Sequence, residues 1–248
     1  VRRLKPDMPI LPLLQNSQND VWEGPGLAKL LGDEVARAKL VQDLVQFVER
    51  YKLQGITIDF EEVPAAAQTH LQKFVAELKT AFEPHSWVVA LAVPFDDDSW
   101  NYEAYAENAD YLMLMAYDQH WATGAAGSIA AQSWFEEKLD KRMAKLDPDH
   151  TIVALGNYAY DWVKGQEASD LTFQEAVLTA RDSEADIAFD DAALNPHFSF
   201  VEDDGKVHDV WMLDGVTTFN EVHASDPYKP AGYALWRLGS EDPSVWNV

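Results

Sequence analysis

The chain has 248 residues, 47% of them apolar, which is enough to build one α/β domain with a sizeable core. Its formal net charge of −23 argues against nucleic acid or an anionic membrane surface as a partner, because phosphates would be repelled; it suits a neutral or cationic ligand, or simple solubility. The absence of cysteine excludes a disulfide framework, a thiolate zinc site and a cysteine nucleophile. No apolar run is long enough to span a bilayer, so no membrane contact is expected within this segment.

Apolar runs separated by amphipathic stretches predict the strands and helices of an α/β fold. The predicted strands are Met8–Leu14, Gly55–Phe60, Trp87–Pro94, Tyr111–Tyr117, Thr151–Tyr158 and Gly232–Leu238. The predicted helices are Asp33–Tyr51, Ala65–Phe82, Ser133–Leu146 and Asp214–His223. This alternation indicates a parallel sheet, and residues 1–248 are treated as a single domain because no repeat or linker interrupts them.

One segment departs from this alternation. The runs His197–Val201 and Val207–Leu213 flank an Asp204-Gly205 pair, which is a strong hairpin signal and predicts a small β-hairpin insertion before the last strand. The parallel strands number six, whereas a closed (β/α)8 TIM barrel has eight. The sheet is therefore open, or two βα units precede this chain in the native protein.

The stretch Gly55–Glu62 places two acids on one face of a strand. Side chains alternate between the faces of a strand, so Asp59 and Glu61 lie opposite Ile58 and Phe60. The apolar face can pack against helices, which turns the acids inward. Inward carboxylates are costly without a partner or a role, and α/β barrels place their chemistry at the C-terminal ends of strands.

Neighbouring carboxylates suit acid catalysis. Each raises the pKa of the other in a partly dry site, and a carboxylic acid that stays protonated near neutral pH can protonate a glycosidic oxygen. The alternative is an edge strand with a solvated acidic face. Glu62 falls on the opposite face, which predicts an exposed structural role.

The same stretch resembles a known signature. Residues 54–61 are similar to Asp-Gly-x-Asp-x-Asp-x-Glu, the fourth-strand signature of glycoside hydrolase family 18, the chitinase-like family. The resemblance implies that Glu61 is the general acid and that Asp59 orients the acetamido group of the substrate. Gln54 and Thr57 occupy the first two Asp positions of the signature.

A second resemblance lies in Met113–Asp118, which is similar to the sixth-strand Met-x-Tyr-Asp motif of the family. It implies that Tyr117 and Asp118 contact the acetamido group and the sugar in the reactive subsite. Met115 is assigned to substrate binding beside them, with a plain core role as the alternative.

Two further segments resemble the family in the expected order. Gly156–Trp162 is similar to the seventh-strand segment of its bacterial cell-wall-lytic branch, which places Tyr158, with Asn157, among the substrate-binding residues. Gly232–Gly239 is similar to the eighth strand, whose tryptophan, here Trp236, forms the floor under the reactive sugar.

Together these resemblances imply a (β/α)8 TIM barrel of the family 18 type whose first two βα units are missing from this chain. The implied activity is hydrolysis of a polysaccharide containing β-linked N-acetylglucosamine (chitin, peptidoglycan or a related polymer) by a substrate-assisted retaining mechanism. No cofactor is required, and the seven histidines show no metal-ligand spacing. The most similar subgroup implies fusion to deacetylase and glycosyltransferase domains and an extracytoplasmic location.

Three other interpretations stay open. The chain could be a chitinase-like carbohydrate-binding domain with little or no activity, a spacer within a larger polysaccharide-processing protein, or a glycosidase with two catalytic carboxylates. The last would need a second inward acid, for which Asp118 is the obvious candidate.

Overall fold

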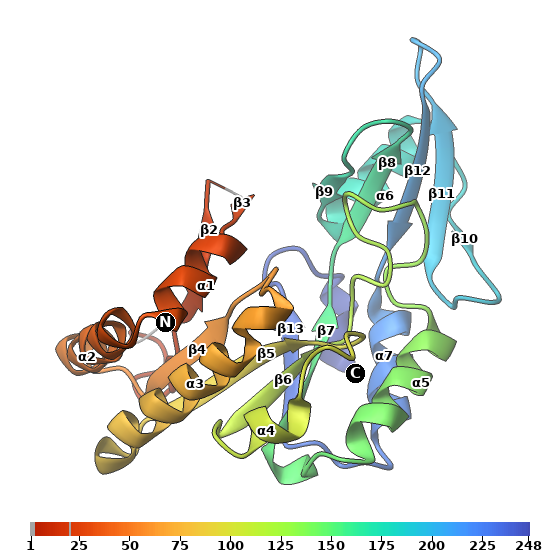
Figure 1. Cartoon of the computed structure of the whole chain (residues 1–248). Coiled ribbons are helices and arrows are strands. Elements are labelled where there is room, and N and C mark those ends of the chain that lie inside the picture. The colour runs from red at the N-terminus through yellow and green to blue at the C-terminus, as the bar shows by residue number, and fades with distance from the viewer. Residues whose placement is uncertain (1–2, 20) are drawn as a thin grey trace. The chain divides into compact units, whose positions relative to one another are not determined.

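The computed structural model of the protein describes residues 3–19 and 21–248 and divides into two compact units, Val1–Met113 and Leu114–Val248. Figure 1 labels most of the helices and strands of both units. All six predicted parallel-type strands are present, although each is shorter than predicted. The expectation of one domain over residues 1–248 stays a prediction.

The first unit contains a parallel sheet in which β4 lies between β1 and β5. The strands of this unit are β1 (Leu13–Gln15), β2 (Ser17–Gln18), β3 (Val21–Trp22), β4 (Gly55–Asp59) and β5 (Val88–Pro94), and β6 (Tyr111–Met115) crosses the boundary to the second unit. Strands β2 and β3 pair with each other in a separate antiparallel sheet. Its helices are α1 (Gly24–Gly32), α2 (Glu34–Tyr51), α3 (Gln68–Phe82) and α4 (Tyr102–Ala106), with short 3-10 turns η1 (Ala65–Ala67) and η2 (Glu83–His85).

Helix α3 packs its apolar face against the sheet of the first unit (Figure 1). Leu71, Phe74 and Leu78 are fully buried at helical spacing, and the ring of Phe74 stacks on that of Phe60 just beyond β4. Helix α2 begins where the Asp33 carboxylate accepts two backbone N–H groups. The predictions for these two helices are thereby confirmed within a few residues, whereas α1 and α4 were not predicted.

The second unit combines a parallel pair with an antiparallel sheet. Its strands are β7 (Thr151–Gly156), β8 (Ala159–Val163), β9 (Ser169–Leu171), β10 (Ala188–Phe189), β11 (Pro196–Val201), β12 (Val207–Met212) and β13 (Gly232–Trp236). Its helices are α5 (Gln132–Met143), α6 (Phe173–Asp182) and α7 (Gly215–Ser225), with 3-10 turns η3 (Pro148–His150) and η4 (Pro243–Asn247). Strands β7 and β13 pair in parallel.

The predicted hairpin is present, but it belongs to a larger structure. Strands β11 and β12 pair in the antiparallel sense within a sheet ordered β10-β11-β12-β8-β9, and α6 lies against this sheet (Figure 1). The strand predicted over Thr151–Tyr158 ends at Gly156, and the chain then enters β8, which pairs with β12 instead of continuing the parallel sheet. One apolar run therefore contributes strands to two sheets, and the spacing of its apolar residues alone could not show this.

No helix among the described residues combines the length and the apolar character needed to cross a membrane.

A buried acid on α7 predicts that the stability of the protein depends on pH. Glu221 is 1% exposed and neither of its carboxyl oxygens has a hydrogen-bond partner among the described residues, so burial raises its pKa well above 4.5. Below pH 4.5 the group is protonated in both states. At higher pH the unfolded carboxyl ionises and folding must take up a proton, so the free energy of unfolding falls as pH rises.

We expect Glu221→Gln to remove this dependence, because the amide is neutral at every pH. In thermal unfolding the variant should match the parent at pH 4 and exceed its Tm at pH 7 by at least about 2 °C, the shift expected for about 1 kcal/mol in a chain of this size. An equal Tm difference at both pH values would contradict the assignment.

Candidate active site

The first unit holds Asp59 in a buried position at the end of β4. Its carboxylate Oδ2 accepts a hydrogen bond of 2.8 Å from Gln15 Nε2, and the two residues lie in register on β1 and β4. Asp59 is 5% exposed, and its Oδ1 has no hydrogen-bond partner among the described residues. Burial raises the pKa of Asp59, and the hydrogen bond from Gln15 lowers it. The Oδ1 oxygen of Asp59 is therefore buried and free to accept a hydrogen bond.

Glu61 follows two residues later and is positioned through its backbone. The side-chain amide of Asn16 accepts from the Glu61 N–H and donates to the Glu61 carbonyl, both at 2.9 Å. Gly24, at the start of α1, lies so close that a Cβ there would fall 2.2 Å from the Glu62 carbonyl oxygen. Glu62 itself is exposed with a φ of 50°, in agreement with its predicted outward position. The turn that carries Glu61 is thus fixed from two sides, and its side chain is half-buried.

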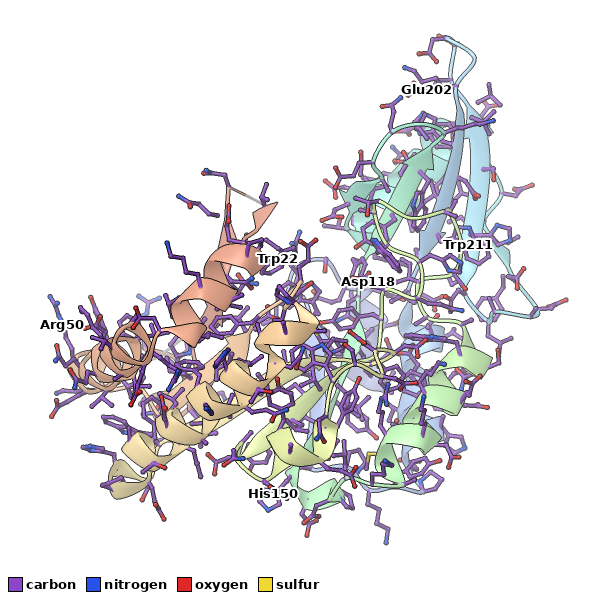
Figure 2. The ribbon with its side chains drawn as sticks, in the orientation of Figure 1. Trp22, Arg50, Asp118, His150, Glu202 and Trp211 are labelled. Carbon is purple, nitrogen blue, oxygen red and sulfur yellow. The ribbon has the colours of Figure 1, made fainter. Side chains whose placement is uncertain are left out.

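The second unit holds Asp118 in a network of phenols. Asp118 follows β6 with a φ of 59°, and its Oδ1 accepts hydrogen bonds from the hydroxyls of Tyr158 (2.5 Å) and Tyr160 (3.1 Å). Burial raises the pKa of Asp118, while the two phenols lower it. Burial also raises the pKa of Tyr158 well above 10, which keeps this hydroxyl a donor. Asp118 is labelled in Figure 2.

A small pocket opens beside this network. It has a volume of about 40 Å³, and its lining includes Asp118, Tyr158, Tyr160, Trp236 and Arg237. This is little more than the share of one water molecule in the liquid, about 30 Å³, so the pocket admits a group of a few atoms and not a sugar ring. Trp236 is 38% exposed and can therefore offer part of its ring to a ligand.

Tyr117, Met115 and Asn157 lie near these residues along the chain. The ring of Tyr117 meets that of Tyr158 edge to face, with centroids 6.1 Å apart. Met115 is half-buried at the end of β6 and points to the same side as Tyr117, since Leu114 and Ala116, which alternate with them, are buried.

Asn157 is 2% exposed, and its side-chain amide has no hydrogen-bond partner among the described residues. Its backbone N–H donates to the Trp236 carbonyl at 2.7 Å. The substrate-binding roles of Met115 and Asn157 stay predictions.

Within each unit, the structure therefore brings the predicted site residues close to one another. Asp59 and Glu61 lie on one strand end, and Asp118, Tyr158 and Trp236 line one pocket. Sequence reasoning missed three residues that position the site. Gln15 binds the Asp59 carboxylate, Asn16 binds the backbone of Glu61, and Tyr160 binds the Asp118 carboxylate. The position of Gln15 and Asn16 at the C-terminal end of the first strand, and the Tyr-x-Tyr spacing, were the available signals. No group of three or more His, Cys, Asp or Glu among the described residues is arranged to hold a metal ion.

Comparison with known proteins identifies the class. A family model described as "Glycosyl hydrolases family 18" matches residues 18–241. The chain is 27% identical to the uncharacterized glycosylase YvbX of Bacillus subtilis, over 92% of this chain and 69% of that protein. It is 22% identical to the cortical fragment-lytic enzyme of Bacillus anthracis, over 95% of this chain and 58% of that protein.

A solved structure supports the fold. The chitinase of Chromobacterium violaceum superimposes with a TM-score of 0.89, covering 98% of this chain and 80% of that one at 22% identity. The α/β fold is accordingly of the TIM-barrel type, and with the family match it defines an O-glycosyl hydrolase. The chain belongs to family 18 of the glycosyl hydrolases.

Proposed function

We propose that this chain hydrolyses a polysaccharide containing β-linked N-acetylglucosamine by a substrate-assisted, retaining mechanism. The observation that carries the proposal is the pair at the end of β4: a buried Asp59 with one unpartnered carboxylate oxygen, and a Glu61 whose backbone is fixed by Asn16. Relatives named as a cortical fragment-lytic enzyme and a chitinase support a glycan substrate.

In the proposed first step, the carbonyl oxygen of the 2-acetamido group attacks the anomeric carbon. As this C–O bond forms, the glycosidic C–O bond breaks, and the leaving oxygen takes the proton of the Glu61 carboxyl group. The unpartnered Oδ1 of Asp59 accepts the acetamido N–H and offsets the positive charge of the oxazolinium ring. The substrate thus supplies the nucleophile that a second carboxylate supplies in most retaining glycosidases.

In the second step, water attacks the anomeric carbon from the face that the leaving group vacated. Glu61, now a carboxylate, takes a proton from this water, and the oxazolinium ring opens back to the acetamido group. Glu61 has then regained its proton, and the β configuration is retained because the anomeric carbon is inverted twice.

We further propose substrate-binding roles for residues of the second unit, from their resemblance to the family 18 motifs. Tyr117 donates a hydrogen bond from its hydroxyl to a carbonyl oxygen of a bound sugar, and the exposed part of Trp236 lies under the apolar face of a sugar ring. The pocket of about 40 Å³ beside Asp118 suits the end of an acetamido group in size. The phenols of Tyr158 and Tyr160 keep the Asp118 carboxylate in place.

A carbohydrate-binding domain with little activity is the second candidate. The family signature has an Asp where this chain has Thr57, and Thr57 lies on the same strand as Asp59, whose Oδ1 has no partner. Fusion to deacetylase or glycosyltransferase domains, and an extracytoplasmic location, stay predictions.

The two candidates differ in turnover. We expect the full chain to cleave oligomers of N-acetylglucosamine and to release products with the β configuration, detectable by proton NMR before mutarotation. Binding of these oligomers without product would favour the binding domain, and initial release of the α anomer would exclude the proposed mechanism.

A further inference from the structure

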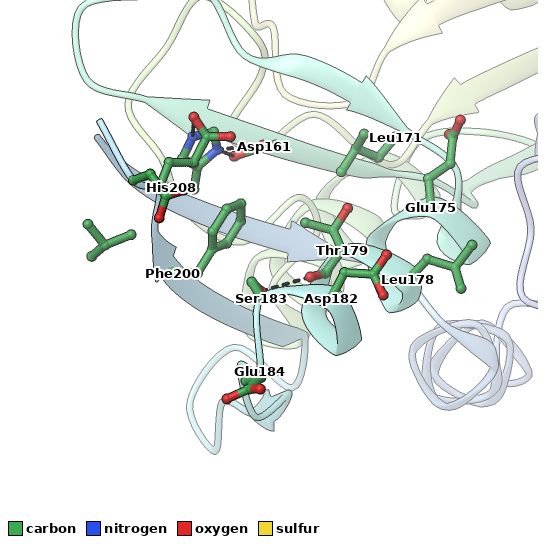
Figure 3. A pocket seen from close by; sticks show the side chains of 13 residues that line it. Asp161, Leu171, Glu175, Leu178, Thr179, Asp182, Ser183, Glu184, Phe200 and His208 are labelled. Carbon is green, nitrogen blue, oxygen red and sulfur yellow. Dashed lines mark hydrogen bonds and ion pairs between the residues drawn. The ribbon is translucent and has the colours of Figure 1, made fainter. Parts of the chain in front are cut away.

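A second concave surface lies in the second unit, among α6 and strands β8, β9, β11 and β12 (Figure 3). The groove has a volume of about 800 Å³, within the usual size of small-molecule sites. Its apolar lining includes Leu171, Leu178 and Phe200. One lining residue, Leu171, also lines the small pocket beside Asp118, and none of the others belongs to the proposed catalytic machinery.

Carboxylates surround this groove. They belong to Asp161, Glu175, Asp182, Glu184, Glu202 and Asp203, and none of the described residues that line the groove is a lysine or an arginine. Four of these acids have partners: Glu175 caps α6, Asp182 pairs with Arg181, and Asp161 and Glu202 both lie beside the His208 ring. A concave surface lined by one sign of charge concentrates ligands of the opposite sign, so Glu184, Glu202 and Asp203 favour a cationic ligand.

His208 adds a buried polar atom that needs a partner. The residue is 9% exposed, its ring stacks on Phe200 with centroids 4.4 Å apart, and its Nδ1 lies 2.8 Å from Asp161 Oδ2. Its Nε2 has no hydrogen-bond partner among the described residues, and the Glu202 carboxylate lies 3.6 Å away. In the neutral imidazole, donation from Nδ1–H to Asp161 makes Nε2 an acceptor.

The groove therefore offers acceptors to its ligand: carboxylates and an imidazole nitrogen. The hydroxyl proton of Ser183 is already donated to the Thr179 carbonyl at 2.7 Å. Lys206, in the turn between β11 and β12, is paired with Asp204 at 2.5 Å and does not line the groove. A matching ligand carries positive charge, several N–H or O–H donors and an apolar face.

We propose that the groove is a separate binding site for deacetylated, amine-bearing glucosamine units of a glycan. The ammonium group faces Glu202 and Asp203, a sugar hydroxyl or ammonium N–H donates to His208 Nε2, and the apolar sugar face lies over Leu171 and Leu178. The choice of a sugar over another amine rests on the proposed function. The groove would hold a partly deacetylated polymer while acetylated units are cleaved elsewhere.

The test measures binding without cleavage, using the full chain with Glu61→Gln and a glucosamine hexamer at low salt in a calorimeter. The added double change Glu202→Gln with Asp203→Asn should raise the Kd for this hexamer at least about tenfold, because two charge-assisted contacts are lost. The matched control, Asp186→Asn with Asp191→Asn, removes the same charge from exposed positions outside the groove lining and should leave the Kd within about twofold, the usual scale of surface changes.

The double change Glu202→Gln with Asp203→Asn, here called the groove variant, should not alter binding of the fully acetylated hexamer. When Glu61 is intact, it should not alter cleavage of that hexamer either. Unchanged glucosamine binding in the groove variant would overturn the inference, as would equal weakening by the control. Equal affinity for an oligolysine of the same charge would indicate a peptide site and also overturn it. If the parent cleaves no acetylated oligomer but only the groove variant loses glucosamine binding, the proposed function fails and this inference stands.

Discussion

Glu61→Gln should abolish most hydrolysis of N-acetylglucosamine oligomers while leaving their binding nearly unchanged. An amide of the same size cannot deliver a proton to the leaving oxygen, and loss of a general acid costs about 10²- to 10⁴-fold in rate. The backbone of the turn should stay in place, because Asn16 binds the N–H and carbonyl of residue 61 and not its side chain. Steady-state rates and binding calorimetry on the same oligomer measure both effects.

The matched control is Glu62→Gln. Glu62 is the next residue, carries the same charge and is exposed, so its change should leave kcat within about twofold. A Glu61→Gln variant as fast as the parent would refute the acid assignment. If instead both variants lost activity and Tm together, the effect would come from the turn and not from the proton.

The sequence predicted the parts of the fold whose signal is local. Gly55–Asp59 is a strand, Phe60 packs on α3, and Asp33 begins α2, all within a few residues of expectation. In each case the alternation or helical spacing of the apolar side chains could be recognised within a short stretch of sequence. The site residues could be recognised in chain order for the same reason, because each lies at or just after the end of a strand.

The missing parts depend on contacts between residues far apart in the chain. Gln15 reaches Asp59 across 44 positions, and Tyr160 reaches Asp118 across 42. Of the five-stranded sheet, the sequence predicted only the hairpin, because β8 pairs with β12, which is distant in the chain. The contact between Asp161 and His208 joins residues 47 positions apart. No periodicity marks such pairings, which are decided by tertiary packing.

Asp59→Asn should lower the rate by about 10²- to 10³-fold, the usual cost of losing one preorganised electrostatic contact to a developing charge. The asparagine keeps the size of the side chain and an oxygen for Gln15 but loses the negative charge that opposes the oxazolinium ring. Single-turnover rates with an N-acetylglucosamine oligomer measure this cost. An unchanged rate would indicate that the substrate acetamido group is not the nucleophile.

The pH profile separates this electrostatic role from a structural one. The mechanism needs Asp59 ionised, and burial already raises its pKa, so the rate should fall as pH drops through that pKa. Gln15→Leu removes the donor that lowers the pKa, and the acidic limb of kcat/KM should therefore move to higher pH while the rate at high pH is largely kept. A uniform loss at every pH would instead assign Gln15 to packing, and it would leave the charge of Asp59 without a demonstrated part in catalysis.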